Sequence, residues 1–417
     1  MQTSDIVFMI FSTALVMLMT PGLALFYGGM VTKNNILNTK MHSYVAIILI
    51  SLQWILFGYS LAFGTDHGGL IGGLNWVGLN GVGFEPNADY SATIPHQLFM
   101  LFQLMFAIIT PALISGAFAE RMKFKVFVIF MLLWATFVYD PLAHWVWGVG
   151  GWIRTLGALD FAGGNVVHIS SGVSGLVGAL MLGKRIKKEE AGPHHIPLTV
   201  LGAGLLWFGW FGFNAGSALG VNGEAGKVAV NAFLTTNTSA AAAALGWIIS
   251  EGLYAKRVTV MGAVSGAVAG LVSITPGAGY VTPMASIIIG LIGGVICYFA
   301  VAVLKEKLGY DDALDAFGCH GIGGTWGAIA TGIFATKSIN SAGADGVLAG
   351  GNWALLGSQI ISVVATYAFA AAGTFVILKG ISFFTSIRVE EEEEKMGLDL
   401  AVHGEKAYGK TFREQTL

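Results

Sequence analysis

The amino-acid sequence predicts an all-α integral membrane protein with eleven transmembrane helices, arranged as a five-plus-five inverted repeat with an eleventh helix added. Three observations carry the membrane prediction. Of the 417 residues, 55% are hydrophobic and only 11% are charged, long apolar runs recur along the chain, and the basic residues lie in alternate connections. Soluble globular proteins carry about 25% charged residues, so this composition excludes an ordinary soluble enzyme. The formal net charge of -2 also argues against a nucleic-acid-binding protein.

Each predicted helix is an apolar run of about 20 residues, the length needed to cross the hydrocarbon core of a bilayer. The first basic residue is Lys33, so the first run lacks the positive segment that begins a signal peptide and is interpreted as a membrane helix. In chain order the runs span residues 6–29, 41–64, 94–118, 123–140, 164–183, 196–214, 228–251, 259–275, 284–304, 317–335 and 353–380.

The distribution of Lys and Arg predicts the orientation of the chain. The connections rich in these residues are 30–40, 119–125, 184–195, 252–258 and 305–316, whereas the alternate connections hold only Arg154, Lys227 and Lys337. Because short cytoplasmic loops are enriched in basic residues, the N-terminus is expected outside the cell and the C-terminal tail inside. The long outer connections, 65–93 and 143–163, are expected to form a vestibule for a cation.

Two segments of the chain resemble each other and predict the inverted repeat. Both have the pattern H-x-x-x-G-x-x-G, beginning at His168 and at His320, and an acidic residue precedes each of them, Asp160 and Asp315. They lie on the fifth and tenth predicted helices, and a separation of five spans reverses the direction of the chain in the membrane. A chance match between Gly-rich helices is the alternative, since small residues also serve helix packing.

Ionisable residues inside membrane spans are candidates for function by default, and His168 and His320 are the two histidines that lie well inside predicted spans. One buried histidine is more often a satisfied core residue, but equivalent positions in a repeat favour a joint role. A neutral imidazole offers one donor and one acceptor, so two such rings side by side can pass a proton along a pore. Asp160 is expected to cap the helix that follows it and to lower the cost of a nearby cation.

Aromatic side chains and cysteines are the remaining candidates. The aromatic residues cluster at Phe102 and Phe106, at Trp145 and Trp147, and over residues 207–213. Such groups usually pack helices or form belts at the membrane interface, and a cation-binding cage is the functional alternative. Cys297 and Cys319 both lie in apolar runs, so the sequence predicts no disulfide framework, no metal site and no cofactor.

In six segments the sequence resembles the ammonium transporter family (Amt/Mep/Rh), and together these segments cover nearly the whole chain. The most specific is Asp-Phe-Ala-Gly-Gly-Asn-Val-Val-His at residues 160–168. The other segments lie at residues 20–29, 102–121, 143–148, 210–217 and 315–324.

The resemblance implies a role for each of eight residues along one pore. These are an outer ammonium site of Phe106, Trp147 and Ser217, a gate of Phe106 and Phe213, a supporting Asp160, a flanking Trp210, and a proton relay of His168 and His320. The Amt branch is favoured over the Rh branch, because Trp147 and Ser217 supply a site for a charged cation at the pore mouth.

The resemblance also implies a homotrimer in the cell membrane of a prokaryote, with one pore per subunit. Residues 1–384 would form the transport domain, and residues 385–417 a cytoplasmic regulatory tail. The implied partners are ammonium and ammonia, the lipid bilayer, and a PII-type signal protein at the cytoplasmic face.

An isolated ammonium ion in a dry apolar pore costs up to tens of kcal/mol, so we expect it to give up its proton near the gate. Ammonia would then cross, and the proton would follow through the two histidines, which makes transport electrogenic. The alternatives are an ammonium sensor, a neutral-gas channel of Rh type, and an intramembrane enzyme or haem protein. The last is disfavoured because the chain lacks an HExxH motif and has no carboxylate at ligand spacing beside either histidine.

Overall fold

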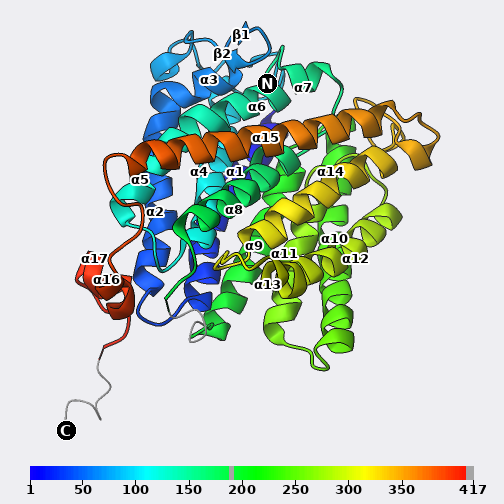
Figure 1. Ribbon diagram of the computed structural model, residues 1–417. Coiled ribbons are helices and arrows are strands. Elements are labelled where there is room, and N and C mark those ends of the chain that lie inside the picture. The colour runs from blue at the N-terminus through cyan, green and yellow to red at the C-terminus, as the bar shows by residue number, and fades with distance from the viewer. Residues whose placement is uncertain (187–191, 410–417) are drawn as a thin grey trace.

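The computed structural model describes residues 1–186 and 192–409, and nearly all of its regular structure is helical (Figure 1). Within these residues, nine helices are long and apolar enough to cross a membrane. Two ends of the molecule are distinguished below. The outer end carries the N-terminus and the small hairpin of β1 (Asp66–His67) and β2 (Ile71–Gly72), and the inner end carries α16 (Glu391–Met396) and α17 (Leu398–His403).

The long elements follow one another with short interruptions. In chain order they are α1 (Thr3–Met30), α2 (Ile36–Gln53) with η1 (Trp54–Gly58) and α3 (Tyr59–Phe63), α4 (His96–Phe118), α5 (Phe124–Trp134) with η3 (Ala135–Tyr139) and α6 (Asp140–Trp147), η4 (Gly164–Ile169) with α8 (Ser170–Leu182), α9 (Ile196–Gly216), α10 (Gly223–Tyr254), α11 (Val260–Ile274), α12 (Pro283–Phe299) with η6 (Ala300–Leu304) and α13 (Lys305–Leu308), η7 (Phe317–Gly321) with α14 (Ile322–Phe334), and α15 (Ala354–Ser382). Short helical turns also occur at η2 (Val77–Leu79), α7 (Trp152–Thr155) and η8 (Val347–Ala349).

The nine long apolar helices coincide with nine of the eleven predicted spans. The other two predicted spans fall on α11, which has 15 residues, and on η7 with α14. Neither is among the nine, so the count of eleven stays a prediction. One boundary was wrong: the outer connection expected to begin at Ala143 is helical as far as Trp147, because α6 continues the helix of α5 and η3.

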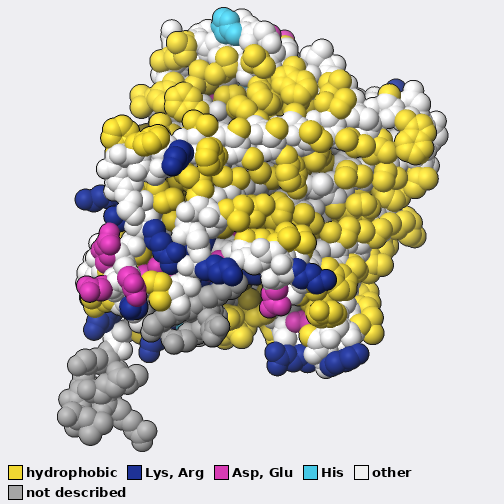
Figure 2. Space-filling model, in the orientation of Figure 1, with side chains coloured by type: hydrophobic (Ala, Val, Ile, Leu, Met, Phe, Trp, Pro, Cys, Tyr) yellow, Lys and Arg dark blue, Asp and Glu magenta, His cyan; other side chains and the backbone are white. Residues whose placement is uncertain are grey.

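Large apolar side chains cover the outside of the bundle. Phe137, Val230 and Leu253 are each more than 60% exposed, and Figure 2 shows a broad apolar surface with Lys and Arg gathered toward the inner end. A surface this apolar is unfavourable in water and favourable in lipid. The chain is therefore a multi-pass membrane protein.

The two histidine-bearing segments begin as π-helices and cross closely. His168 lies in η4 and His320 in η7, and a Cβ atom built at Gly172 would lie 2.2 Å from the backbone nitrogen of Gly321. A side chain at Gly172 would force the two helices apart. Glycine is thus required here by the close approach of two backbones, which brings the two imidazoles together in the core.

Candidate functional site

A large cavity lies at the outer end of the bundle. Its volume is about 700 Å³, and its lining includes Phe106, Trp147, Asp160 and Ser217. These residues come from α4, the end of α6, the loop before η4, and the position directly after α9. The fold thus brings together four residues that the sequence placed in four separate segments. We call this cavity the outer vestibule.

Hydrogen bonds fix the two polar groups of the predicted outer site. The indole Nε1 of Trp147 donates to the carbonyl oxygen of Asp160 at 2.9 Å, and the Ser217 hydroxyl donates to the carbonyl oxygen of Phe213 at 2.9 Å. Because its proton is committed to its own helix, the Ser217 oxygen keeps its lone pairs for a donor in the vestibule. The rings of Phe106 and Trp147 meet edge to face, with centroids 5.9 Å apart.

Two phenyl rings close the floor of the vestibule. The centroids of Phe106 and Phe213 are 4.2 Å apart, and both side chains are almost completely buried. Phe106 lines the vestibule, whereas Phe213 lines a separate and much smaller cavity below it. The predicted gate pair therefore lies between two compartments.

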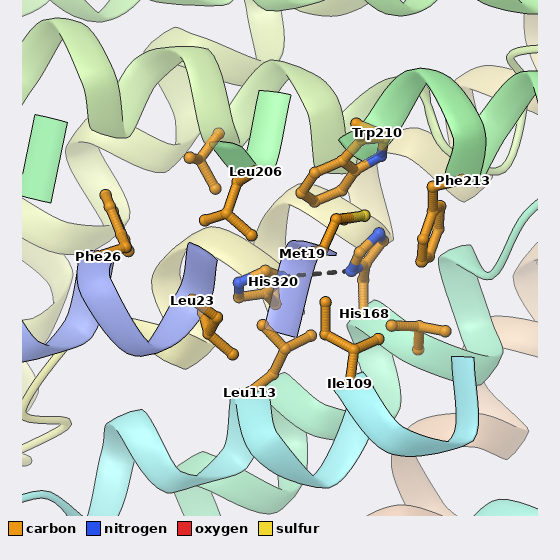
Figure 3. A pocket seen from close by; sticks show the side chains of 12 residues that line it. Met19, Leu23, Phe26, Ile109, Leu113, His168, Leu206, Trp210, Phe213 and His320 are labelled. Carbon is orange, nitrogen blue, oxygen red and sulfur yellow. Dashed lines mark hydrogen bonds between the residues drawn. The ribbon is translucent and has the colours of Figure 1, made fainter. Parts of the chain in front are cut away.

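The small cavity, which we call the pore cavity, is narrow and apolar. Its volume, about 10 Å³, is about the space that the centre of a single water-sized molecule needs. Figure 3 shows the imidazoles of His168 and His320 among the apolar side chains that line the pore cavity. The lining consists of Met19, Leu23, Phe26, Ile109, Leu113, Val167, His168, Leu206, Trp210, Phe213, Val268 and His320.

The two histidines share one hydrogen bond. Nδ1 of His320 lies 3.2 Å from Nδ1 of His168, drawn as the dashed line in Figure 3. This bond requires one ring to carry its proton on Nδ1 and the other on Nε2. The Nε2 atom of His168 is buried and has no partner within the described chain, so it is free to bind a molecule in the pore cavity.

Trp210 packs against the imidazole of His168. Its indole lies over His168 with centroids 5.4 Å apart, and its Nε1 donates to the hydroxyl of Thr275 at 2.9 Å. The indole nitrogen is therefore satisfied by the protein, and Trp210 presents only its apolar ring to the pore cavity.

Comparison with known proteins now decides the family. The sequence profile of the Ammonium Transporter Family matches residues 7–408. The chain belongs to the ammonium transporter family. It is 62% identical to the ammonium transporter of Bacillus subtilis (strain 168) over 98% of this chain and 99% of that protein.

Solved structures show the same fold. The crystal structure of Saccharomyces cerevisiae Mep2 matches with a TM-score of 0.85 at 33% identity, covering 99% of this chain and 93% of that one. A structure titled "Sensor Amt Protein" matches with a TM-score of 0.88 at 30% identity, covering 96% and 98%. The family fold predicted from the sequence is thus confirmed.

Asp160 holds the start of the first histidine segment of this family member. Its carboxylate accepts hydrogen bonds from the backbone amides of Gly163, Gly164, Asn165 and Val166, at 2.6 to 3.4 Å. Burial raises the pKa of this carboxyl above its usual value, although the four amide bonds oppose the shift. All four donors are backbone groups of one turn, so the carboxylate acts as the predicted cap.

The acid equivalent to Asp160 in the second half is Asp312, and the sequence prediction of Asp315 was wrong. Asp312 accepts from the amides of Ala316 and Phe317 at 3.1 and 2.7 Å, and it precedes His320 by the same eight residues that separate Asp160 from His168. Burial raises its pKa to about 6. Asp315 instead forms an ion pair with Lys305, and its backbone has a positive φ of 60°.

A third cavity, the inner vestibule, opens at the inner end with a volume of about 470 Å³. It shares Phe26, Val268 and His320 with the pore cavity, and the ion pair of Lys305 and Asp315 lines it. His320 therefore borders both compartments. Outer vestibule, pore cavity and inner vestibule lie in series, with the phenyl pair at the upper boundary.

The structure adds vestibule residues that sequence reasoning missed. Gln103, Phe161 and Tyr280 line the outer vestibule, and Gln103 is one helical turn before Phe106 on α4. The signal for Gln103 was available, since residues three apart share a helix face. Tyr280 had no such signal, because only folding brings its loop against Phe161, where the ring centroids lie 5.4 Å apart.

Proposed function

We propose that this chain transports ammonium by binding the cation in the outer vestibule, removing its proton at the phenyl gate and conducting ammonia past the two histidines. The proposal rests on the difference between the two cavities that Phe106 and Phe213 separate. A wide vestibule with charged groups lies above these rings, and a narrow cavity without a charged side chain in its described lining lies below them.

The outer vestibule suits a small cation. Its lining includes Asp89, Asp160 and Glu224 against one basic residue, Arg154, whose guanidinium is held by the carbonyl oxygen of Trp147 at 2.7 Å. The excess of acidic groups raises the local concentration of cations. The faces of the two rings of the outer site attract an unhydrated cation by roughly 0.5 to 2 kcal/mol each, and the Ser217 oxygen accepts one of its N–H groups.

The pore cavity does not suit a cation. No carboxylate side chain lines its described part, and an uncompensated charge in such a site costs tens of kcal/mol. Loss of the proton above the gate leaves neutral ammonia, which can donate and accept hydrogen bonds at the free Nε2 of His168. Asp160 acts without touching the substrate, because its oxygens are occupied by backbone amides.

The proton follows along the histidine pair in this proposal. His168 takes up the proton at Nε2 and passes its Nδ1 proton to Nδ1 of His320, which releases its own Nε2 proton toward the inner vestibule; the relay leaves the two rings with exchanged tautomers. Each cycle then moves one net positive charge.

The test is ammonium-evoked current in proteoliposomes at several pH values. Replacing both His168 and His320 with Leu is expected to abolish the current while the protein still assembles. Undiminished current would refute the relay. Ammonium uptake without current in the wild-type protein would instead support a neutral-gas channel of Rh type.

A sensor is the second candidate, favoured by the likeness to the structure titled "Sensor Amt Protein". Its pore would bind ammonium and signal through the tail without conducting. Saturable ammonium binding by the wild-type protein, with neither current nor ammonium uptake, would support the sensor and refute the transporter.

We further propose that residues 385–417 are a regulatory tail, of which residues 410–417 lie outside the described chain. The tail docks on the inner end: Asp399 accepts from the amide of Asn38 at 2.8 Å, the amide of Leu398 donates to Asn35 at 2.8 Å, and Arg388 donates to the carbonyl oxygen of Leu182 at 2.9 Å. A PII-type partner and a homotrimer remain proposals that rest on the family resemblance. Capture of the partner from cytosol by the full chain, but not by a chain lacking residues 385–417, tests the first, and the mass of the detergent-solubilised protein tests the second.

A further inference from the structure

A fully buried carboxyl group, that of Asp140, lies in the membrane-spanning part of the chain and has no part in the pathway above. It occupies the first position of α6, directly after η3, and its side chain faces Gln53 at the end of α2. Ionisable residues in a membrane span are costly and rarely without consequence. Asp140 therefore requires a physical explanation.

Only some of the polar atoms of Asp140 and Gln53 have hydrogen-bond partners within the described chain. Nε2 of Gln53 donates to Oδ2 of Asp140 at 2.7 Å, and more weakly to the hydroxyl of Thr136 at 3.3 Å. The other two oxygens, Oδ1 of Asp140 and Oε1 of Gln53, are both buried and have no partner within the described chain. Two acceptor oxygens cannot satisfy each other unless one of them carries a proton.

Among the described residues, no basic side chain lies within ion-pair distance of Asp140. The nearest basic residue on the same helix is His144, one turn later, and its two ring nitrogens are taken by the carbonyl oxygen of Ala62 at 2.9 Å and by Asp66 at 2.8 Å. No Lys, Arg or His pairs with Asp140 among the ion pairs of the described residues. An ionised carboxylate here would be buried with a single neutral hydrogen-bond partner, which is strongly unfavourable.

We propose that Asp140 is a neutral carboxylic acid that forms a cyclic pair with Gln53 and so positions Trp147 at the outer site. In this pair the amide N–H donates to Oδ2, and the acid O–H on Oδ1 donates to Oε1 of Gln53. Both unpartnered oxygens are then satisfied by one proton. The amide of Gln53 fits here because Gly58 has no side chain: a Cβ atom at that position would lie 2.5 Å from Oε1 of Gln53.

The positioning role follows from where the pair lies. Asp140 begins α6 and Trp147 ends it, so the pair ties the start of this two-turn helix to α2 while the indole at its end faces the vestibule. The π-helices η1 and η3 directly adjoin Gln53 and Asp140. A π-helical turn interrupts the regular hydrogen-bond pattern of an α-helix. The hydrogen bonds between Asp140 and Gln53 lie at this level and so fix the path of α6.

Infrared spectroscopy of the reconstituted protein at neutral pH tests the protonation state. We expect a carbonyl band of a protonated carboxyl group in the wild-type chain that is lost in Asp140→Asn and shifted in Gln53→Leu. Asp66→Asn is the matched control, because Asp66 is partly exposed and the hydrogen bond from His144 lowers its pKa. Loss of a carboxylate band instead of an acid band in Asp140→Asn would overturn the proposal.

A transport measurement tests the positioning role, and this arm rests on the proposed function. Asn presents the same donor and acceptor as a neutral acid, so Asp140→Asn is expected to keep the half-saturation for ammonium within about twofold, a change of less than about 0.5 kcal/mol. Asp140→Leu leaves Gln53 with only its weaker bond to Thr136 and is expected to raise the half-saturation several-fold. Equal half-saturation in both variants would overturn the positioning role. Absence of current in the wild-type protein would refute the transport proposal alone, because the infrared result does not depend on transport.

Discussion

Replacement of Trp147 by Leu tests the outer site most directly. The indole of Trp147 stands edge to face against Phe106, and its Nε1 donates to the carbonyl oxygen of Asp160. A cation–π contact contributes roughly 0.5 to 2 kcal/mol, and each 1.4 kcal/mol changes an equilibrium constant tenfold. The half-saturation for ammonium-evoked current is therefore expected to rise by about two- to thirty-fold in Trp147→Leu.

Trp147→Phe separates the ring from the hydrogen bond, because it keeps an aromatic face and removes the indole N–H. We expect its half-saturation to lie between those of the wild-type and Trp147→Leu proteins. Maximal current at saturating ammonium should change little in either variant, since Trp147 is not part of the pore cavity. An unchanged half-saturation in Trp147→Leu would refute the cation–π site. Equal losses in the two variants would show that the bond to Asp160 matters and the ring face does not.

Two further predictions concern the crossing of the histidine helices and the inner end. Gly172→Ala places a methyl group 2.2 Å from the Gly321 nitrogen and is expected to lower the melting temperature and abolish current. The control Gly204→Ala meets open space, so it should leave current unchanged and either leave stability unchanged or raise it by about 0.4 to 1 kcal/mol. Normal current in Gly172→Ala would contradict the close approach of the two helices. At the inner end, burial opposes ionisation of Asp311, but the hydrogen bonds and charge of Arg185 lower its pKa to about 2 from 3.8. A lowered folded-state pKa stabilises the protein above pH 3.8, and this contribution disappears as the pH falls toward 2. Asp311→Asn should therefore cost about 1 to 3 kcal/mol at pH 7 and flatten the acid limb of a thermal-stability profile, and an unaltered limb would exclude this pair as its cause.

Hydropathy and charge predicted most of the bundle correctly, because lipid imposes length and polarity on each helix separately. The same reasoning was weakest where a helix is shielded by its neighbours. The segment of η7 and α14 carries six glycines and His320, so its composition is less apolar than that of a lipid-facing span. Helix boundaries were also uncertain, and the continuation of α6 to Trp147 had no signal in local composition.

The site shows the same division. The eight candidate residues were found from motifs, and the structure places them along three cavities in series, but their roles stay predictions. The repeat was found from glycine and histidine spacing, with Asp160 and Asp315 noted as the acidic residues shortly before the two motifs. The hydrogen bonds from the amides of Ala316 and Phe317, together with the eight-residue spacing to His320, identify Asp312 instead.

The low charge and the alternating basic loops by themselves determined that this chain crosses a membrane many times, because each apolar run must satisfy the bilayer on its own. The motifs determined the family. The tertiary structure alone decided which groups meet: the phenyl pair between two cavities, the two Nδ1 atoms 3.2 Å apart, and Asp140 against Gln53. Such contacts join residues as many as 152 positions apart, and their distances depend on how helices pack, which no local pattern of residues specifies.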